Sequence, residues 1–335
     1  MHFWMTDKFK KAQSFDAFAP FLLWWEILEK NVKAHIVTGF IEAGKTTYIQ
    51  SLITNDFFHK REAGKTLILA FESGQVDYDE ELLSEYKTKV VFREDEDIRE
   101  FINEGIKDHD PDRIFIEYNA MTEGLWEVLT GMLDIAGITM LIDHSTLNLY
   151  YRNMPQKMRD MIAVADPVII NRAKEKEALD IYATPFRIMN TKALFLWESP
   201  MGYHEKIFGN PLPFDPSVSE IVLSDKDFPA WYVDALEFPG NYEGKIIDAH
   251  LQIKERPDRD GFMAGRMVMT CCMNDISFLG VEINAKDMKI QNDMFVHLKA
   301  KARVKEEGAG KRLVLDVIDM EAEPYPKDIV LSVLR

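Results

Sequence analysis

Short apolar runs alternate with longer polar stretches from residue 32 to about residue 200. The apolar runs have little polar interruption and read AHIVT, TLILAF, KVVF, RIFIEY, ITMLID and PVIIN. Strands that are apolar on both faces and separated by helices are typical of a parallel sheet with helices on either side. The pattern therefore predicts an α/β domain with a mostly parallel sheet over residues 32–200.

The period of the pattern changes after a segment rich in glycine and proline. That segment, residues 201–217, suits neither a helix nor a strand and is predicted to be a linker. In residues 218–335 apolar and polar positions alternate, which predicts a small all-β barrel or sandwich. About five strands are expected, near residues 247–254, 262–270, 278–283, 296–305 and 312–320.

Residues 1–31 form an aromatic-rich leader ahead of the α/β pattern. Phe21, Trp24, Trp25 and Leu28 would share one face of a helix. We predict a leader helix that docks on the following domain, with binding to a membrane surface or to a partner as the alternative.

Composition narrows the class of protein. The chain has 335 residues, which fits about two domains, and 40 basic against 56 acidic residues give a net charge of −16. Such a charge argues against attraction of the whole surface to nucleic acid. The two cysteines, Cys271 and Cys272, are adjacent and cannot form a long-range disulfide, which favours the cytoplasm. The apolar run over residues 17–25 is too short to span a membrane, which takes about 20 residues.

The residues from Gly39 to Thr46 read GFIEAGKT, which fits the phosphate-loop pattern G-x-x-x-x-G-K-[ST] between a strand and a helix. Its glycines let backbone N–H groups surround phosphate oxygens. Lys45 is predicted to neutralise the β and γ phosphates, and the Thr46 hydroxyl to reach Mg²⁺. The predicted nucleotide-binding residues here are Gly39, Glu42, Ala43, Gly44, Lys45, Thr46 and Thr47.

A second GKT string, from Gly64 to Thr66, lacks the first glycine of the pattern and precedes a strand instead of a helix. We interpret it as a turn.

The motifs of this domain resemble those of CobW-like GTPases, which belong to the SIMIBI class. The loop GFIEAGKTT is similar to the family's GFLGAGKTT, ESGQVDYD to NEFGEVGID, IEYNA to IETTG, ADPVIINR to ADRIILNK, and FRIMNTKA to an IRxLNPxA element. The resemblance covers about residues 33–198 and implies a P-loop GTPase. It also implies that Glu72 and Glu117 serve Mg²⁺ and catalysis together with Lys45, and that Asn171 and Asn190 contact the nucleotide. Strand-end carboxylates facing a P-loop suit Mg²⁺, and Glu117 follows the more apolar strand.

Departures from the family pattern bear on the activity. The string that begins at Asn171 reads NRAK where the family has NKxD, and Lys174 cannot accept hydrogen bonds from guanine. The sequence therefore leaves GTP and ATP both open. Ala120 replaces a glycine, Tyr118 replaces a small hydroxyl residue, and Glu42 adds a carboxylate to the loop, which favours slow or partner-dependent hydrolysis. The family's CxCC metal motif is absent.

The C-terminal stretch from Phe262 to Asp275 resembles the GRFxMSCCVADA motif of YcgQ-like, permease-associated proteins, and the likeness covers about residues 236–327. The resemblance implies an OB-type barrel and a membrane permease partner. Cys271 and Cys272 could hold Zn²⁺ or another soft metal with His250 or Asp275 as further ligands, but we favour burial of both thiols in the core.

A basic stripe alternates along one predicted strand, and we interpret it as a solvated face. Nucleic-acid binding is the less favoured interpretation of this stripe. Its residues are His297, Lys299, Lys301, Arg303 and Lys305.

The sequence thus predicts a cytoplasmic, Mg²⁺-dependent nucleoside triphosphatase that acts as a nucleotide switch or in a metallochaperone-like role in metal homeostasis. A permease subunit or a metalloprotein client is the expected partner, and the oligomeric state is left open. The alternative is a nucleotide-binding adaptor that does not hydrolyse its nucleotide and docks on a membrane permease subunit.

Overall fold

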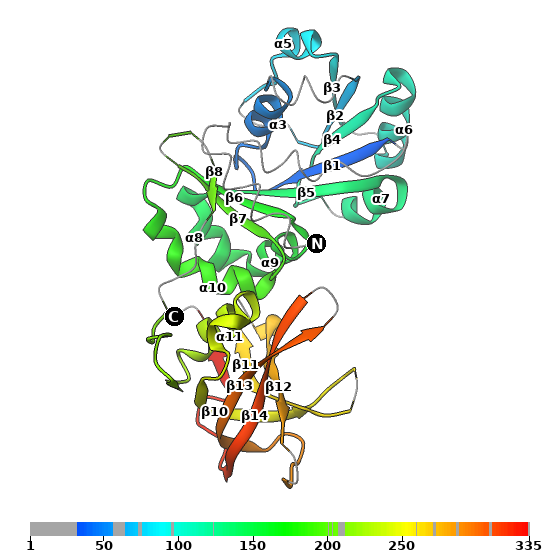
Figure 1. Cartoon of the computed structure of the whole chain (residues 1–335). Helices are drawn as coiled ribbons and strands as arrows, with labels where there is room; N and C mark the ends of the chain where they lie inside the picture. The colour runs from blue at the N-terminus through cyan, green and yellow to red at the C-terminus, as the bar shows by residue number, and fades with distance from the viewer. Residues whose placement is uncertain are drawn as a thin grey trace. The chain divides into compact units, whose positions relative to one another are not determined.

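The computed structural model describes most of the chain after residue 31. The described ranges are 32–55, 64–72, 76–94, 97–122, 124–199, 201–202, 204–206, 212–258, 260–270, 273–285, 288–307 and 310–333. The predicted leader helix over residues 1–31 lies outside them. The described chain divides into two compact units, a sheet unit and a barrel unit (Figure 1).

The sheet unit is built on an eight-stranded sheet with the order β3-β2-β4-β1-β5-β6-β7-β8. Strands β1 to β7 all run parallel, and only the short strand β8 at the edge is antiparallel to its neighbour. This confirms the predicted α/β class. The strands are β1 (Lys33–Thr38), β2 (Thr66–Ala70), β3 (Thr88–Phe92), β4 (Arg113–Glu117), β5 (Asp134–Asp143), β6 (Pro167–Asn171), β7 (Leu194–Glu198) and β8 (His204–Lys206).

Helices cover both faces of this sheet and give it two apolar cores (Figure 1). One core packs α3 and α5 on the sheet, and the other packs α6 and α7 on the opposite face. Aspartates at positions 79, 97 and 143 begin α5, α6 and α8 by accepting backbone N–H groups of the first turn. The helices are α3 (Lys45–Ile53), α5 (Glu80–Glu85), α6 (Ile98–His109), α7 (Leu125–Met132), α8 (His144–Asn153), α9 (Pro155–Val164) and α10 (Asp180–Met189), with a 3-10 turn at Lys176–Leu179.

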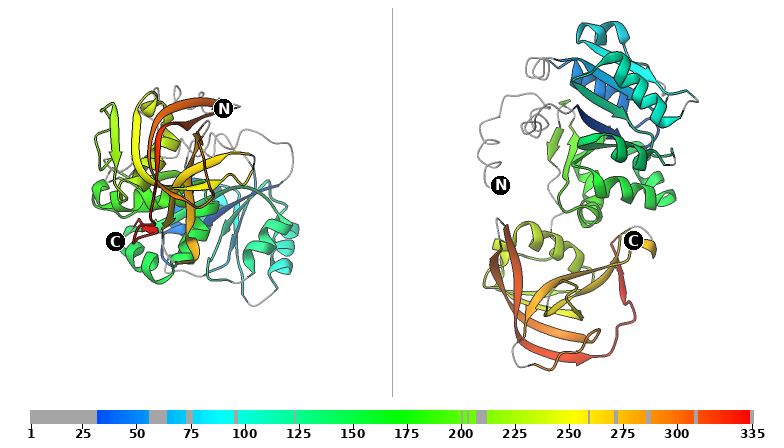
Figure 2. Two further views of the ribbon diagram at one scale, coloured as in Figure 1. Left: turned by 90° about the horizontal axis from the view of Figure 1, so that it is seen from below. Right: turned by 90° about the vertical axis from the view of Figure 1, so that its right-hand side faces the viewer.

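The barrel unit is a closed ring of five strands, in the order β10-β11-β12-β14-β13 and back to β10. This confirms the predicted small all-β, OB-like barrel. Figure 2 shows its long strands, coloured yellow to red, curling around one core. The ring strands are β10 (Ile246–Glu255), β11 (Phe262–Met269), β12 (Ser277–Asn284), β13 (Phe295–Glu307) and β14 (Gly310–Glu323).

Further elements extend the ring beyond what the alternating pattern predicted. Strands β9 (Glu220–Leu223) and β15 (Val330–Ser332) pair with β10 and β11, and helix α11 (Phe228–Glu237) supplies Trp231 to the barrel core. Short 3-10 turns lie at Pro239–Tyr242 and Met273–Asp275.

The unit boundaries differ in two places from the predicted domains. Strand β8 lies inside the expected linker and pairs with β7. Helix α10 lies in the sequence between β6 and β7 but groups with the barrel unit. Within the described residues, no helix is long and apolar enough to cross a membrane.

Candidate functional site

The phosphate loop joins the carboxyl end of β1 to the start of α3. Gly39 is required here, because a Cβ at this position would lie 2.4 Å from the carbonyl oxygen of Leu141. Gly44 precedes α3 in a left-handed conformation with φ 89°, which glycine adopts without strain. The loop therefore directs the N-terminus of a nine-residue helix toward the loop interior, the arrangement that binds phosphate.

Lys45 is buried inside this loop, with only 2% of its surface exposed. Its Nζ donates to the carbonyl oxygens of Gly39 (3.2 Å) and Phe40 (2.9 Å). It also forms an ion pair with Glu72 Oε1 at 2.5 Å. The lysine is thus held at the place where the motif expects phosphate, and Glu72 balances its charge.

Thr46 and Glu117 meet beside Lys45. The register pairs Val37 of β1 with Glu117 of β4, so the two parallel strands end together and bring Glu117 to the loop. The Thr46 hydroxyl donates to Glu117 Oε1 (2.8 Å), and the Tyr78 hydroxyl donates to Oε2 (2.6 Å).

Burial shifts the pKa values of both Glu117 and Tyr78. Burial raises the pKa of Glu117, although hydrogen bonds from Tyr78 and Thr46 and the charge of Lys45 oppose the rise. Burial, followed by the charge of Glu117, holds the pKa of Tyr78 well above its usual value, so the phenol keeps its proton.

The residues fit a magnesium ion. Mg²⁺ prefers oxygen ligands, and Thr46, Glu117 and Glu72 offer a hydroxyl and two carboxylates at one point of the loop. The second carboxylate oxygen of Glu72 is buried and has no hydrogen-bond partner among the described residues, as expected of a group awaiting a ligand. The role of these side chains toward Mg²⁺ remains a prediction.

The predicted base-recognition segment also reaches the loop. Asn171 Nδ2 donates to the carbonyl oxygen of Ala43 (2.7 Å), and its Oδ1 is buried with no partner in the described chain. Arg172 donates to the carbonyl oxygen of Glu42 (2.9 Å) and pairs with Asp143 at 2.5 Å. Burial opposes ionisation of Asp143, but hydrogen bonds from Ser145 and Arg172 outweigh it and lower the pKa of its carboxyl.

Other predicted residues lie at the margin of this group. The side chains of Glu42 and Thr47 are exposed, as is that of Lys174. Asn190 follows α10, where its N–H donates to the carbonyl oxygen of Phe186 (3.0 Å), so its nucleotide contact remains a prediction.

Three residues of the site escaped the sequence reasoning, namely Tyr78, Asp143 and Arg172. Tyr78 stands where the family string has isoleucine, so the resemblance offered no signal for it. Asp143 closes an apolar strand just before a helix, and that position alone could have marked it as facing the loop.

The second GKT string is a turn, as predicted. Lys65 N–H donates to Asp112 Oδ2 (2.7 Å), and strand β2 begins at Thr66. No helix N-terminus follows it, so it lacks the means to hold phosphate.

The predicted soft-metal site falls on Cys271 and Cys272, which lie outside the described residues. Of its expected further ligands, His250 contacts Glu323 Oε2 (2.6 Å), and Asp275 accepts from the Thr270 N–H (3.1 Å). The described part of the chain holds no cluster of three metal-binding side chains. Zn²⁺ binding remains a prediction.

The basic stripe on β13 is largely matched by acids on β9, β10 and β14 of the same sheet. His297 contacts Asp248 (2.6 Å), Lys299 contacts Glu220 (2.6 Å), and Arg303 contacts Asp316 (2.6 Å). Paired charges leave little net field for a phosphate backbone, which favours the interpretation as a solvated face.

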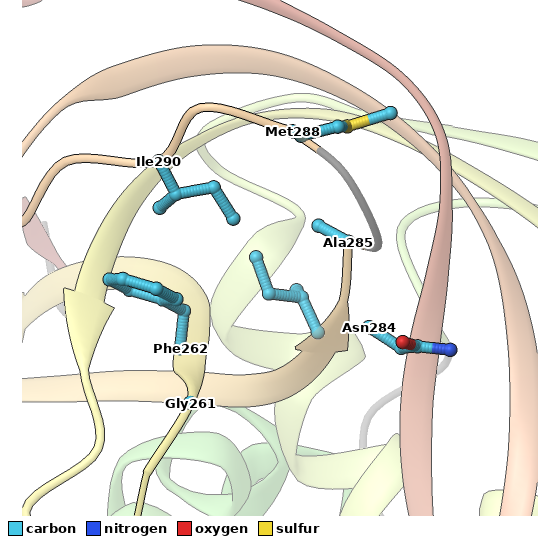
Figure 3. Close-up of a pocket in the computed structure, with 7 residues that line it drawn as sticks. Gly261, Phe262, Asn284, Ala285, Met288 and Ile290 are labelled. Atoms are coloured by element: carbon cyan, nitrogen blue, oxygen red, sulfur yellow. The ribbon is translucent and has the colours of Figure 1, made fainter.

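A small pocket of about 290 Å³ opens on the barrel unit (Figure 3). Its lining is apolar apart from Asn284, whose amide already donates to Asp316 Oδ1 (2.8 Å). Without a free charged group it offers no chemistry comparable to that of the phosphate loop. The apolar lining is supplied by Phe262, Ile283, Ala285, Met288 and Ile290.

Comparison with known proteins agrees with this geometry. Residues 33–194 match the family described as CobW/HypB/UreG, nucleotide-binding domain, and residues 214–330 match the DUF1980 C-terminal domain. The chain is thus similar to a nucleotide-binding domain of the CobW/HypB/UreG family over one range and to a DUF1980 C-terminal domain over the other, which confirms the predicted CobW-like resemblance. Among curated proteins, none matches the sequence.

The solved structures that match the chain share little sequence with it. The hydrogenase maturation factor HypB from Archaeoglobus fulgidus is 17% identical, with 50% of this chain and 81% of that chain covered and a TM-score of 0.35. HypB from Helicobacter pylori in complex with nickel is 12% identical, with 53% of this chain and 83% of that chain covered and a TM-score of 0.35. The Zn(II)-bound YjiA GTPase from E. coli is 13% identical, with 70% of this chain and 86% of that chain covered and a TM-score of 0.36. These likenesses are too weak to support an argument about activity.

Proposed function

We propose that the chain binds a nucleoside triphosphate together with Mg²⁺ and hydrolyses it slowly, with GTP as the nucleotide that the family favours. The contact between Thr46 and Glu117, next to the buried Lys45, is the observation that carries this proposal. A hydroxyl, a carboxylate and an ammonium group at the N-terminus of a helix are the parts that phosphoryl transfer uses.

Each residue has a task in this proposal. Lys45 and the loop N–H groups hold the phosphates, and Lys45 exchanges Glu72 for a phosphate oxygen because one ammonium cannot fully serve both. Thr46, Glu117 and Glu72 would hold the metal. When bound, Mg²⁺ neutralises charge on the phosphate oxygens. Asn171 orders the loop through the carbonyl oxygen of Ala43.

Slow turnover is supported by the segment that follows β4. Ala120 stands where the family has a flexible glycine, and its carbonyl oxygen accepts from Lys157 Nζ (3.2 Å). Asn119 Oδ1 accepts the N–H of Met121 (2.8 Å), which closes a turn. A segment held this way adjusts less readily to a γ-phosphate than a glycine hinge would.

Base selection should be weak. Lys174 occupies the place of the family's guanine-binding aspartate and is exposed. Loss of charge-assisted hydrogen bonds removes about 1.5–3 kcal/mol of preference, or about one to two decades in affinity. GTP and ATP should therefore differ by far less than with an intact NKxD motif.

We further propose a cytoplasmic role in metal homeostasis, as a nucleotide switch or metallochaperone-like protein that acts on a permease subunit or a metalloprotein client. The family of the sheet unit and the presence of a DUF1980 domain support this role. Cys271 and Cys272 are the residues that would hold a soft metal in this role, as the alternative to the burial of both thiols that we favour.

Titration of the full chain with GTP and ATP, with and without Mg²⁺, tests the nucleotide proposal. In Lys45→Ala, affinity should fall about 10- to 100-fold. Because Lys45 pairs with Glu72, a Lys45→Ala/Glu72→Gln variant avoids leaving an unpaired buried carboxylate. Lys65→Ala, from the second GKT string, is the matched control and should bind normally.

The outcomes separate the candidate functions. Equal affinity in the Lys45 variants and the wild type would exclude the phosphate loop as the binding site. Normal Mg²⁺-dependent binding with turnover no faster than the background would favour the adaptor that does not hydrolyse its nucleotide.

A further inference from the structure

Tyr78 contacts the carboxylate at the centre of the site from a position where the family string has isoleucine. Its hydroxyl donates to Glu117 Oε2 at 2.6 Å, a short hydrogen bond of the kind formed by a neutral donor and a charged acceptor. Thr46 occupies the other oxygen, Oε1, at 2.8 Å. The orientation of Glu117 is therefore fixed from two sides, by one residue of the phosphate loop and one residue outside it.

The backbone around Tyr78 is fixed independently of Glu117. The N–H of Asp79 donates to Gln50 Oε1 of α3 (2.8 Å), and Asp79 Oδ1 accepts the N–H of Leu82 in the first turn of α5 (3.0 Å). The ring of Tyr78 is 7% exposed and packs in the core between α3, α5 and the sheet. These hydrogen bonds and this packing hold the Tyr78 hydroxyl in place beside Glu117.

We propose that Tyr78 is a positioning residue that holds Glu117 in the orientation needed for Mg²⁺. This inference rests on the proposed function. A Thr46 hydroxyl that held the metal through an oxygen lone pair would keep its proton for Oε1, and Tyr78 would restrain the other carboxylate oxygen, Oε2. A carboxylate with a fixed orientation binds a metal more tightly than one that must first be ordered.

The Tyr78→Phe variant removes the hydroxyl and keeps the ring. Binding of the fluorescent nucleotide mant-GTP is measured over a series of MgCl₂ concentrations. The affinity for mant-GTP without Mg²⁺ should change by less than about twofold, because the hydroxyl that the variant removes donates to Glu117, which is proposed to serve the metal and not the phosphates. The MgCl₂ concentration that gives half of the maximal increase in mant-GTP binding should rise about tenfold, because the variant loses a hydrogen bond to a charged group.

Tyr48→Phe is the matched control. Tyr48 is buried to the same extent in the same core, but the hydroxyls that donate to the Glu117 carboxylate are those of Thr46 and Tyr78. It should lose comparable thermal stability and leave the Mg²⁺ dependence unchanged. A second comparison places Tyr78→Phe in a Glu117→Gln background, where it should cause no further change in Mg²⁺ dependence.

Each outcome decides a separate point. If the wild type shows no Mg²⁺-dependent binding of mant-GTP, the proposed function itself fails. If the wild type does and Tyr78→Phe has the same Mg²⁺ dependence, only the role of Tyr78 fails. An equal effect in Tyr48→Phe, or an undiminished effect in the Glu117→Gln background, would show that the loss of core packing is responsible.

Discussion

Glu42 has a strained backbone conformation, and its negative charge opposes the binding of phosphate by the loop that contains it. It adopts a left-handed conformation with φ 62°, which costs a residue with a side chain about 1–2 kcal/mol relative to the right-handed region. Its exposed carboxylate lies in a loop that is proposed to receive a triphosphate. The Arg172 guanidinium bonds its carbonyl oxygen at 2.9 Å and so helps to hold the strained turn.

The Glu42→Gly variant should therefore bind nucleotide more tightly. Removing an exposed like charge is worth up to about 1 kcal/mol, or about fivefold in affinity for GTP. Relief of the left-handed strain should also raise the free energy of unfolding by about 1 kcal/mol. Isothermal titration and urea unfolding measure the two quantities.

Glu42→Gln separates the two effects, because it removes the charge and keeps the strained backbone. It should gain affinity without gaining stability. Weaker GTP binding in both variants would instead mean that the Glu42 carboxylate contributes to the site.

At the scale of elements, β1 carries a buried ionisable group behind the phosphate loop. His35 is 5% exposed, and its Nε2 lies 2.8 Å from Thr139 Oγ1 of the adjacent strand β5. Burial lowers the pKa of His35 from 6.5 to about 4. The imidazole is therefore neutral in the folded protein at pH values where it would be charged in the unfolded chain.

This difference predicts an acid-sensitive sheet unit. As the pH falls from 6.5 to about 4, His35 binds a proton in the unfolded state but stays neutral in the folded state. The folded state therefore loses stability relative to the unfolded state. The loss reaches about 3 kcal/mol at the acid end of the window. This loss is measured by urea unfolding at several pH values, monitored through a signal that reports on the sheet unit.

His35→Gln keeps a hydrogen-bonding group for Thr139 and removes the titration. The free energy of unfolding should then depend less steeply on pH between 6.5 and 4, and the variant should match the wild-type slope above pH 7. The same slope in both proteins throughout would show that other groups cause the acid sensitivity.

The elements also show how far the sequence could lead. Apolar runs such as RIFIE placed β4 correctly, because a strand buried on both faces needs an uninterrupted apolar segment. Period-two alternation likewise located the five ring strands of the barrel. Strand β8 was missed, because three residues in a glycine- and proline-rich segment carry no periodic signal.

The candidate site also has a part that the sequence could predict and a part that it could not. Lys45, Thr46 and Glu117 follow from motifs whose spacing reflects phosphate chemistry, and the structure brings them together. The contact of Glu72 with Lys45 and that of Tyr78 with Glu117 could not be predicted. They depend on how the chain returns to the loop after β2, which is a matter of tertiary packing.

At the scale of the molecule, each unit has an apolar core of its own, so we expect two unfolding transitions. Helix α10 is the segment for which sequence position and packing disagree. It lies between β6 and β7 in the sequence, but Ile188 packs against the barrel core and Arg187 pairs with Glu237 of α11 at 3.1 Å. The stability of the barrel unit therefore depends on a segment outside residues 212–335.

A fragment of residues 212–335 should consequently be less stable than the barrel within the full chain. Exposing the contact surface of Ile188 and losing the partly buried Arg187 pair should lower the free energy of unfolding by about 1–3 kcal/mol. Ile188→Ala in the full chain should shift the barrel transition in the same direction and leave GTP binding intact. If the fragment unfolds at the same urea concentration as the barrel transition of the full chain, α10 contributes nothing to the barrel.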